Sequence, residues 1–154
     1  MIKIAPSILS ADLLKIEQEV MKVDEAGADY IHIDIMDGHY VPNISFGLNI
    51  IKCLRPLTNK ILDIHLMISP VKQWIENIAK AGADIISFHP EADSNPEKII
   101  EKIKKLECKC GIAIHPRVEI KEIEKYIPLA DLIVVMGVVP GFGGQTFMKN
   151  QLTK

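Results

Sequence analysis

Residues 30–43 decide the fold, and they read Tyr-Ile-His-Ile-Asp-Ile-Met-Asp-Gly-His-Tyr-Val-Pro-Asn. Isoleucines at alternate positions are separated by His32, Asp34 and Met36. A period of two indicates a β-strand with two different faces. We expect the isoleucine face to pack against helices and the other face to carry the imidazole, the carboxylate and the thioether. The turn dipeptide Asp37-Gly38 ends the strand, so the polar row lies near a carboxyl end, where α/β folds build their sites.

A second run repeats this pattern, because residues 62–67 read Leu-Asp-Ile-His-Leu-Met. A single His or Asp in a strand is usually a solvated or hydrogen-bonded residue. Two strands that each bring a His and a Met to the carboxyl end are hard to explain as core filling. We therefore interpret His32, Asp34 and His65 as the centre of a metal or catalytic site.

Length and composition place the chain among ordinary globular proteins. It has 154 residues, of which 48% are hydrophobic and 25% charged, with a net charge of −2. These values predict a single domain over residues 1–154 and give no sign of nucleic-acid or membrane binding. A strand pattern begins directly after Met1 with no leader-like segment, so we expect a cytoplasmic location.

The three cysteines, Cys53, Cys108 and Cys110, match neither a disulfide framework nor the spacing of a zinc site. We expect three reduced thiols.

Hydrophobic periodicity predicts strands that alternate with helices along the whole chain. The expected strands cover residues 2–9, 30–36, 61–67, 85–89, 109–115 and 132–136. The expected helices lie between the cap at Asp12 and Ala26, over 48–54, over 71–81, from Pro96 to Leu106, over 120–127, and from Gln145 onward. Six β–α units in series imply a parallel sheet covered by helices.

Two architectures fit this order, an open doubly wound sheet and a (β/α)8 barrel. A complete barrel typically takes about 250 residues. The chain would then be a barrel that lacks its last quarter, or an open sheet.

Two imidazoles and one carboxylate from adjacent strands are the core of a divalent-metal site, suited to Zn²⁺, Fe²⁺ or Mn²⁺. Three protein ligands leave positions open for substrate oxygens, and a metal there can polarise a carbonyl and stabilise an enediolate. Asp34 could then act as base on the neighbouring carbon. Asp37 is a rival carboxylate, but its Asp-Gly turn explains it as a backbone feature.

Two further features lie near strand ends. Met36, Met67 and Met136 occupy equivalent positions, where core packing and a polarisable lid over a reacting carbanion are both open interpretations. Residues 141–144, Gly-Phe-Gly-Gly, precede an expected helix, and their free N–H groups with the helix dipole suit a phosphate. His89 and His115 also end strands; one of them could line the mouth of the site, but a structural role is the expectation for both.

Together, these motifs resemble the ribulose-phosphate 3-epimerase family, over residues 4 to about 148. The resemblance is carried by Ala5-Pro-Ser-Ile-Leu-Ser-Ala-Asp12, His32-Ile-Asp-Ile-Met-Asp-Gly-His-Tyr-Val-Pro-Asn43, Asp63-Ile-His-Leu-Met67, Ser87-Phe-His89 and Pro140-Gly-Phe-Gly-Gly-Gln-Thr-Phe147. It implies a (β/α)8 barrel, here with about six β/α units. The implied reaction is the conversion of D-ribulose 5-phosphate to D-xylulose 5-phosphate, in the pentose phosphate pathway, through a metal-held enediolate.

The same resemblance implies roles for individual residues. His32, Asp34 and His65 would bind a divalent cation (Zn²⁺, Fe²⁺, Mn²⁺ or Co²⁺), and Asp34 would also be a catalytic acid/base. Substrate contacts would come from Ser7, His65, the sulfur cap of Met36, Met67 and Met136, and the loop residues Gly141, Phe142, Gly143 and Gly144. A sugar phosphate is the expected partner, and we expect a homo-oligomer.

The chain also departs from the family pattern. The family's second catalytic Asp, which is also its fourth metal ligand, lies on a seventh strand that these residues do not include. Gly137, Val139 and His115 stand where the family usually has Ser or Thr, a polar residue, and Asn. Two alternatives therefore stay open: a non-catalytic fragment that binds metal or sugar phosphate or pairs with another chain, and a sister epimerase of ketohexose phosphates.

Overall fold

The computed structural model describes residues 1–154 and contains one parallel sheet. Its five strands follow the chain in order and are β1 (Tyr30–Met36), β2 (Ile61–Met67), β3 (Ile85–Phe88), β4 (Lys109–Ile114) and β5 (Leu132–Val135). Each strand pairs in parallel with the next, so every connection is a β–α–β crossover. The predicted α/β class with a parallel sheet is confirmed.

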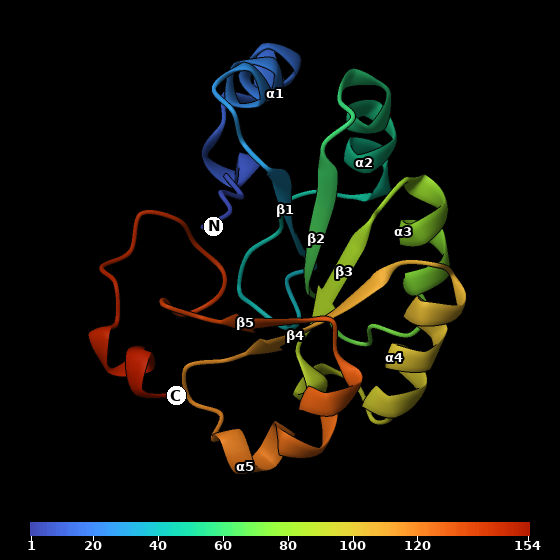
Figure 1. Ribbon diagram of the computed structural model, residues 1–154, viewed down its shortest axis with the longest axis vertical. Coiled ribbons are helices and arrows are strands. Elements are labelled where there is room, and N and C mark those ends of the chain that lie inside the picture. The colour runs from blue at the N-terminus through green and yellow to red at the C-terminus, as the bar shows by residue number, and fades with distance from the viewer.

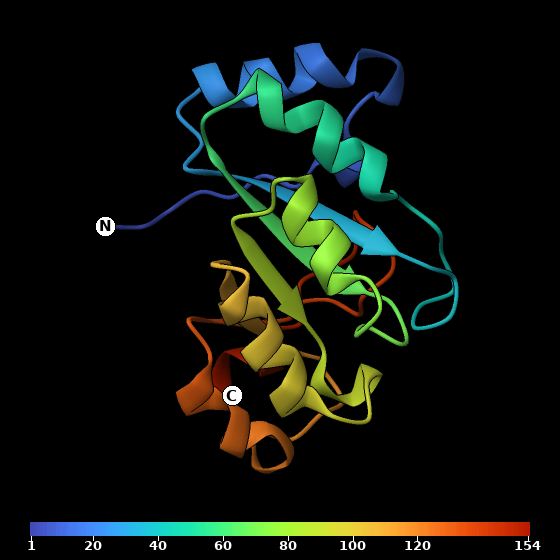
Figure 2. The ribbon, with the colours of Figure 1, turned by 90° about the vertical axis from the view of Figure 1, so that its right-hand side faces the viewer.

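The helices cover the outer side of this curved sheet. They are α1 (Ile16–Glu25), α2 (Leu48–Leu54), α3 (Ile75–Ala81), α4 (Pro96–Lys105) and α5 (Ile120–Ile123). They follow one another from the top of Figure 1, down its right side, to the bottom, and Figure 2 shows α2, α3 and α4 facing the viewer. The loop after β5 lies on the left of Figure 1, where the sheet is open. None of the helices is both long and apolar enough to cross a lipid bilayer.

The alternating pattern of β1 gives it two buried faces with different chemistry. Ile31 and Ile33 are fully buried in the main core, on the side of the helices. Full burial of such a side chain contributes about 1.5–3 kcal/mol. A register slip of one residue would turn these isoleucines to the other face, so the core fixes the register. That register pairs Asp34 with His65 and Met36 with Met67.

The first expected strand, residues 2–9, does not form, and that prediction was wrong. Ile4 accepts hydrogen bonds from the backbone of residues 29 and 30, and Pro6 accepts one from His32. The next bond of a parallel ladder would need an N–H at residue 6, and proline has none. The segment therefore runs beside β1 with only one isolated bridge, between Ser7 and His32.

The helix expected from Gln145 is also absent. Met148 donates its backbone N–H to the carbonyl of Gly137 at 2.8 Å, which returns the chain to the end of β5. Only a short 3₁₀ helix, Lys149–Thr153, follows. Elsewhere the differences are smaller: α3 begins at Ile75 instead of residue 71, and α5 gives way to a 3₁₀ helix, Glu124–Leu129, that contains Pro128.

Candidate metal centre

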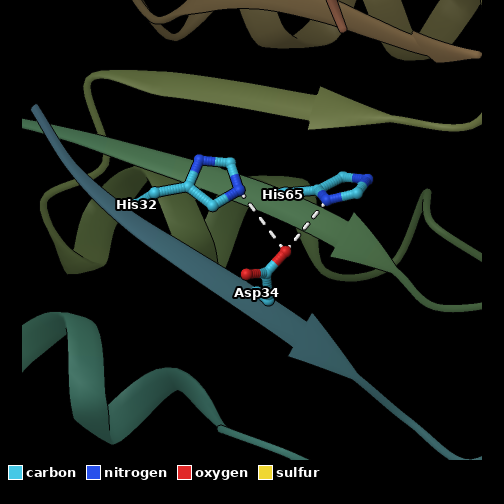
Figure 3. A group of neighbouring side chains, drawn as sticks. All are labelled: His32, Asp34 and His65. Atoms are coloured by element: carbon cyan, nitrogen blue, oxygen red, sulfur yellow. Dashed lines mark hydrogen bonds and ion pairs between the residues drawn. The ribbon is translucent and has the colours of Figure 1, made fainter. Parts of the chain in front are cut away.

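Strands β1 and β2 bring the three predicted metal ligands together. His32 and Asp34 lie two residues apart on one face of β1, and the register of β2 sets His65 beside Asp34. The Nδ1 atom of His65 lies 3.1 Å from Oδ1 of Asp34, and Nε2 of His32 lies 3.4 Å from the same oxygen. Figure 3 shows both rings directed at this oxygen. One potential ligand atom from each residue lies within 4.8 Å of the other two.

Asp34 contacts both histidines of this group. Its other oxygen, Oδ2, accepts a hydrogen bond from the hydroxyl of Ser7 at 2.6 Å. Burial alone would raise the pKa of Asp34, but hydrogen bonds from His32 and His65 and the positive charge of His32 outweigh it and hold the pKa well below its usual range. The carboxylate is therefore ionised at neutral pH, although Asp34 is only 9% exposed.

The His32 ring is held in its orientation by the carboxylate of Asp63. Its Nδ1 lies 2.8 Å from Oδ2 of Asp63, which leaves Nε2 directed toward Asp34. Burial lowers the pKa of His32, but the hydrogen bonds to Asp34 and Asp63 raise it to about 10. The two carboxylates thus favour a positive charge between them, which is the electrostatic setting that a cation needs.

His65 is the most enclosed of the three, with 1% of its surface exposed. Burial lowers its pKa and keeps the ring neutral at pH 7. Its Nε2 lies 3.0 Å from Nε2 of His89, which follows β3. A neutral ring with one nitrogen toward Asp34 is the form in which imidazole binds metals.

A cavity of about 180 Å³ adjoins this centre. Its wall contains the predicted acid/base Asp34 and most of the residues predicted to contact substrate, namely Ser7, Met36, Met67, Met136, Gly141, Phe142 and Gly143. Two residues of the predicted substrate set do not line the cavity: Gly144, which follows in the same loop, and His65 of the metal centre. Met36 and Met67 are buried together against Val41, whereas Met136 is half-buried.

Two amides hold the glycine-rich loop in place. Asn43 donates through Nδ2 to the carbonyl of Gly141 at 2.7 Å. Gln145 donates to the carbonyls of Val139 and Phe142, at 2.6 and 2.8 Å. Gly141 has a φ of +123°, which disfavours any residue with a side chain. The loop is thus ordered without the following helix that the sequence led us to expect.

The sequence predictions left out two side chains that the site contains. Asp63 lies on the same face of β2 as His65, and this period-two spacing is a signal that could have identified it. His89, for which a structural role was expected, contacts His65. Asp37 has the backbone role expected for it, because its carboxylate accepts N–H groups of His39, Tyr40 and Ser69.

Comparison with known proteins gives one family. A family model described as "Ribulose-phosphate 3 epimerase family" matches residues 3–154. Ribulose-phosphate 3-epimerase of Synechocystis is 48% identical over 99% of the chain, and that of Bacillus subtilis is 47% identical over 100%. The chain spans 67% and 71% of these two relatives and 64% of ribulose-phosphate 3-epimerase 1 of Cupriavidus necator.

Solved structures of other proteins share the fold. Dihydropteroate synthase of Yersinia pestis has a TM-score of 0.58 at 16% identity, with 98% of this chain and 62% of that chain covered. The tryptophan synthase alpha subunit of Legionella pneumophila has a TM-score of 0.60 at 14% identity, with 87% and 61% covered. This likeness shows the architecture: the sheet is part of a (β/α)8 barrel.

Proposed function

Because the chain belongs to the ribulose-phosphate 3-epimerase family, we propose that it serves the metal-dependent epimerisation of D-ribulose 5-phosphate at C3, which gives D-xylulose 5-phosphate. The observation that carries the proposal is the convergence of His32, Asp34 and His65 beside the cavity. The same proposal places the chain in the pentose phosphate pathway, in the cytoplasm, and in a homo-oligomer.

The donor set fits a divalent cation. Two imidazole nitrogens and one carboxylate oxygen suit Zn²⁺, Fe²⁺, Mn²⁺ or Co²⁺, and Asp63 orients His32 as outer carboxylates orient metal-binding histidines. When bound, the cation would supply positive charge that stabilises negative charge on substrate oxygens. The protein side chains would bind the sugar and move the proton.

Asp34 is the proposed acid/base. Its low pKa keeps it ionised, and it lines the cavity, so it could accept the proton from C3 of a bound ketose phosphate. The hydroxyl of Ser7, at 2.6 Å from Oδ2, would hold the carboxylate in one orientation during this transfer.

The residues that line the cavity or lie next to it would bind and shield the substrate. We assign this role to Ser7, His65, Met36, Met67, Met136, Gly141, Phe142, Gly143 and Gly144. The methionines would exclude water from the reacting carbon, since their thioethers are apolar and polarisable. The loop would offer backbone N–H groups to the phosphate, without help from a helix dipole.

A specific observation favours a second candidate, a chain that binds sugar phosphate but does not epimerise it alone. Asp34 is the only carboxylate among the cavity-lining residues. Epimerisation needs a proton removed from one face of C3 and returned to the other. A single carboxylate on one face can exchange that proton with solvent, but does not readily serve both faces.

Incubation of the protein with ribulose 5-phosphate in D₂O, with and without added Mn²⁺ or Zn²⁺, separates the two candidates. Deuterium at C3 together with xylulose 5-phosphate supports epimerisation. Deuterium in recovered ribulose 5-phosphate, without xylulose 5-phosphate, identifies Asp34 chemistry on one face only. No deuterium under any metal would contradict the assignment of Asp34 as acid/base and leave binding alone as the function of these residues.

Asp34→Asn is the matching variant, because the amide keeps the shape but cannot accept the proton. Loss of a general base typically costs about 10²–10⁴-fold in rate. Asp12→Asn is the control, since Asp12 caps a 3₁₀ turn away from the cavity and Asn caps equally well. Activity of Asp34→Asn within a few-fold of the parent would rule out Asp34 as the acid/base.

A further inference from the structure

His89 is a fully buried imidazole that the proposed reaction does not use. It follows β3 directly, has no exposed surface, and does not line the cavity. Its Nε2 lies 3.0 Å from Nε2 of His65, and the two ring centroids are 5.1 Å apart. A buried polar side chain in contact with a proposed metal ligand calls for a specific role.

A cation bound at this centre would determine which nitrogen of each ring carries the hydrogen. The Nδ1 atom of His65 faces Asp34, so it is the nitrogen available to a cation at this centre. A metal-binding imidazole is neutral and keeps its hydrogen on the other nitrogen. His65 must then carry its hydrogen on Nε2 and donate it to Nε2 of His89. His89 in turn must carry its own hydrogen on Nδ1.

The surroundings of His89 suit this arrangement. Its Nδ1 has no hydrogen-bond partner within ordinary distance, but Oε1 of Glu91 lies 3.6 Å away. The same oxygen accepts a hydrogen bond from the hydroxyl of Tyr40 at 2.8 Å, and the Tyr40 ring packs on His89 with centroids 4.8 Å apart. A shift of a few tenths of an ångström would bring Nδ1 within hydrogen-bond distance of the carboxylate.

Each proposed histidine ligand thus has its second nitrogen occupied by a residue from the next strand along the sheet. His32 on β1 meets Asp63 on β2, and His65 on β2 meets His89 after β3. We propose that His89, backed by Glu91, is a positioning residue that accepts the Nε2 hydrogen of His65 and thereby aims Nδ1 at the cation. This inference rests on the proposed metal centre and deepens it.

Metal affinity tests the proposal with a matched set of variants. His89→Leu removes the acceptor and keeps most of the volume, whereas His89→Gln offers an amide oxygen near the position of Nε2. Loss of such an outer contact typically weakens metal binding by about 10–100-fold, so we expect this loss of Zn²⁺ affinity in His89→Leu and recovery to within a few-fold in His89→Gln. His115→Leu is the control, because the His115 ring lies beside that of His89 and contacts none of the three ligands.

Nitrogen NMR of the zinc-loaded parent protein gives a second readout that needs no variant. With ¹⁵N-labelled histidine, we expect a hydrogen on Nε2 of His65 and a ¹⁵N–¹⁵N coupling across the hydrogen bond to His89. Its absence, or a His89→Leu protein that binds zinc as the parent does, would overturn the proposal. If His89→Leu does not fold, the NMR result decides. A parent that binds no metal at His32, Asp34 and His65 would instead overturn the proposed function.

Discussion

At the residue scale, the site depends on which atoms of each side chain are already occupied. The Ser7 hydroxyl donates a hydrogen bond to one oxygen of Asp34, and the Asp63 carboxylate hydrogen-bonds one nitrogen of His32. Sequence pattern identified Asp34 and His32 because period two places them on one face. It could not identify the contact of His89 with His65, because that contact depends on how β2 and β3 lie beside each other.

The three thiols give a residue-scale prediction that does not depend on function. Cys53 is exposed, whereas Cys108 and Cys110 are buried. Burial raises the pKa of Cys110 to about 12, so its thiol is protonated at pH 8 as well as inaccessible. Iodoacetamide should therefore label Cys53 alone in the folded protein and all three residues in denaturant. Native labelling of Cys110, read by peptide mass spectrometry, would contradict the packing of β4.

At the element scale, the sequence predicted helices and strands wherever one periodicity dominated. The helix α2 has the expected bounds, Leu48–Leu54, and so do β1 and β2. The strand predicted over residues 2–9 is absent because Pro6 lacks an N–H, and a hydrophobic pattern does not register that missing donor. The helix predicted after Gly144 is absent because Phe147 packs over Gly137 and the Met148 N–H bonds to the Gly137 carbonyl. The sequence of the segment itself does not show either contact.

Close packing between β3 and β4 gives an element-scale prediction. A Cβ atom at Gly111 would lie 2.1 Å from Oγ and 2.8 Å from Cβ of Ser87 on the neighbouring strand. Gly111→Ala should destabilise the fold by about 1–3 kcal/mol, the usual cost of overpacking. Urea unfolding of Gly111→Ala, of Ser87→Gly and of the double variant measures the coupling. Full additivity of the two changes would contradict the contact.

At the scale of the whole molecule, the sheet has two open edges. One is β5, where Val135 is 44% exposed, and the other is the N-terminal segment, where Ile4 is 58% exposed. Both present apolar residues beside backbone groups that no other strand pairs. Open apolar edges pair with other chains. The free energy of unfolding of a folded domain is only about 5–15 kcal/mol, so pairing between chains can rival the contacts within one chain.

A polypeptide of residues 1–154 alone should therefore associate in solution. Light scattering across a concentration series should show species larger than the monomer. Val135→Lys should reduce this association, because a lysine on an edge strand opposes pairing. A cooperative monomer at all concentrations, with epimerase turnover, would mean that the chain covers both edges and supplies the second acid/base by other means.

The central claim is that His32, Asp34 and His65 bind one divalent cation, and an anomalous-difference map of crystals grown with Zn²⁺ tests it most directly. We predict a single peak between β1 and β2, about 2.0–2.2 Å from Nε2 of His32, an oxygen of Asp34 and Nδ1 of His65. Zinc held by other residues, with these three side chains directed away from one another, would contradict the account.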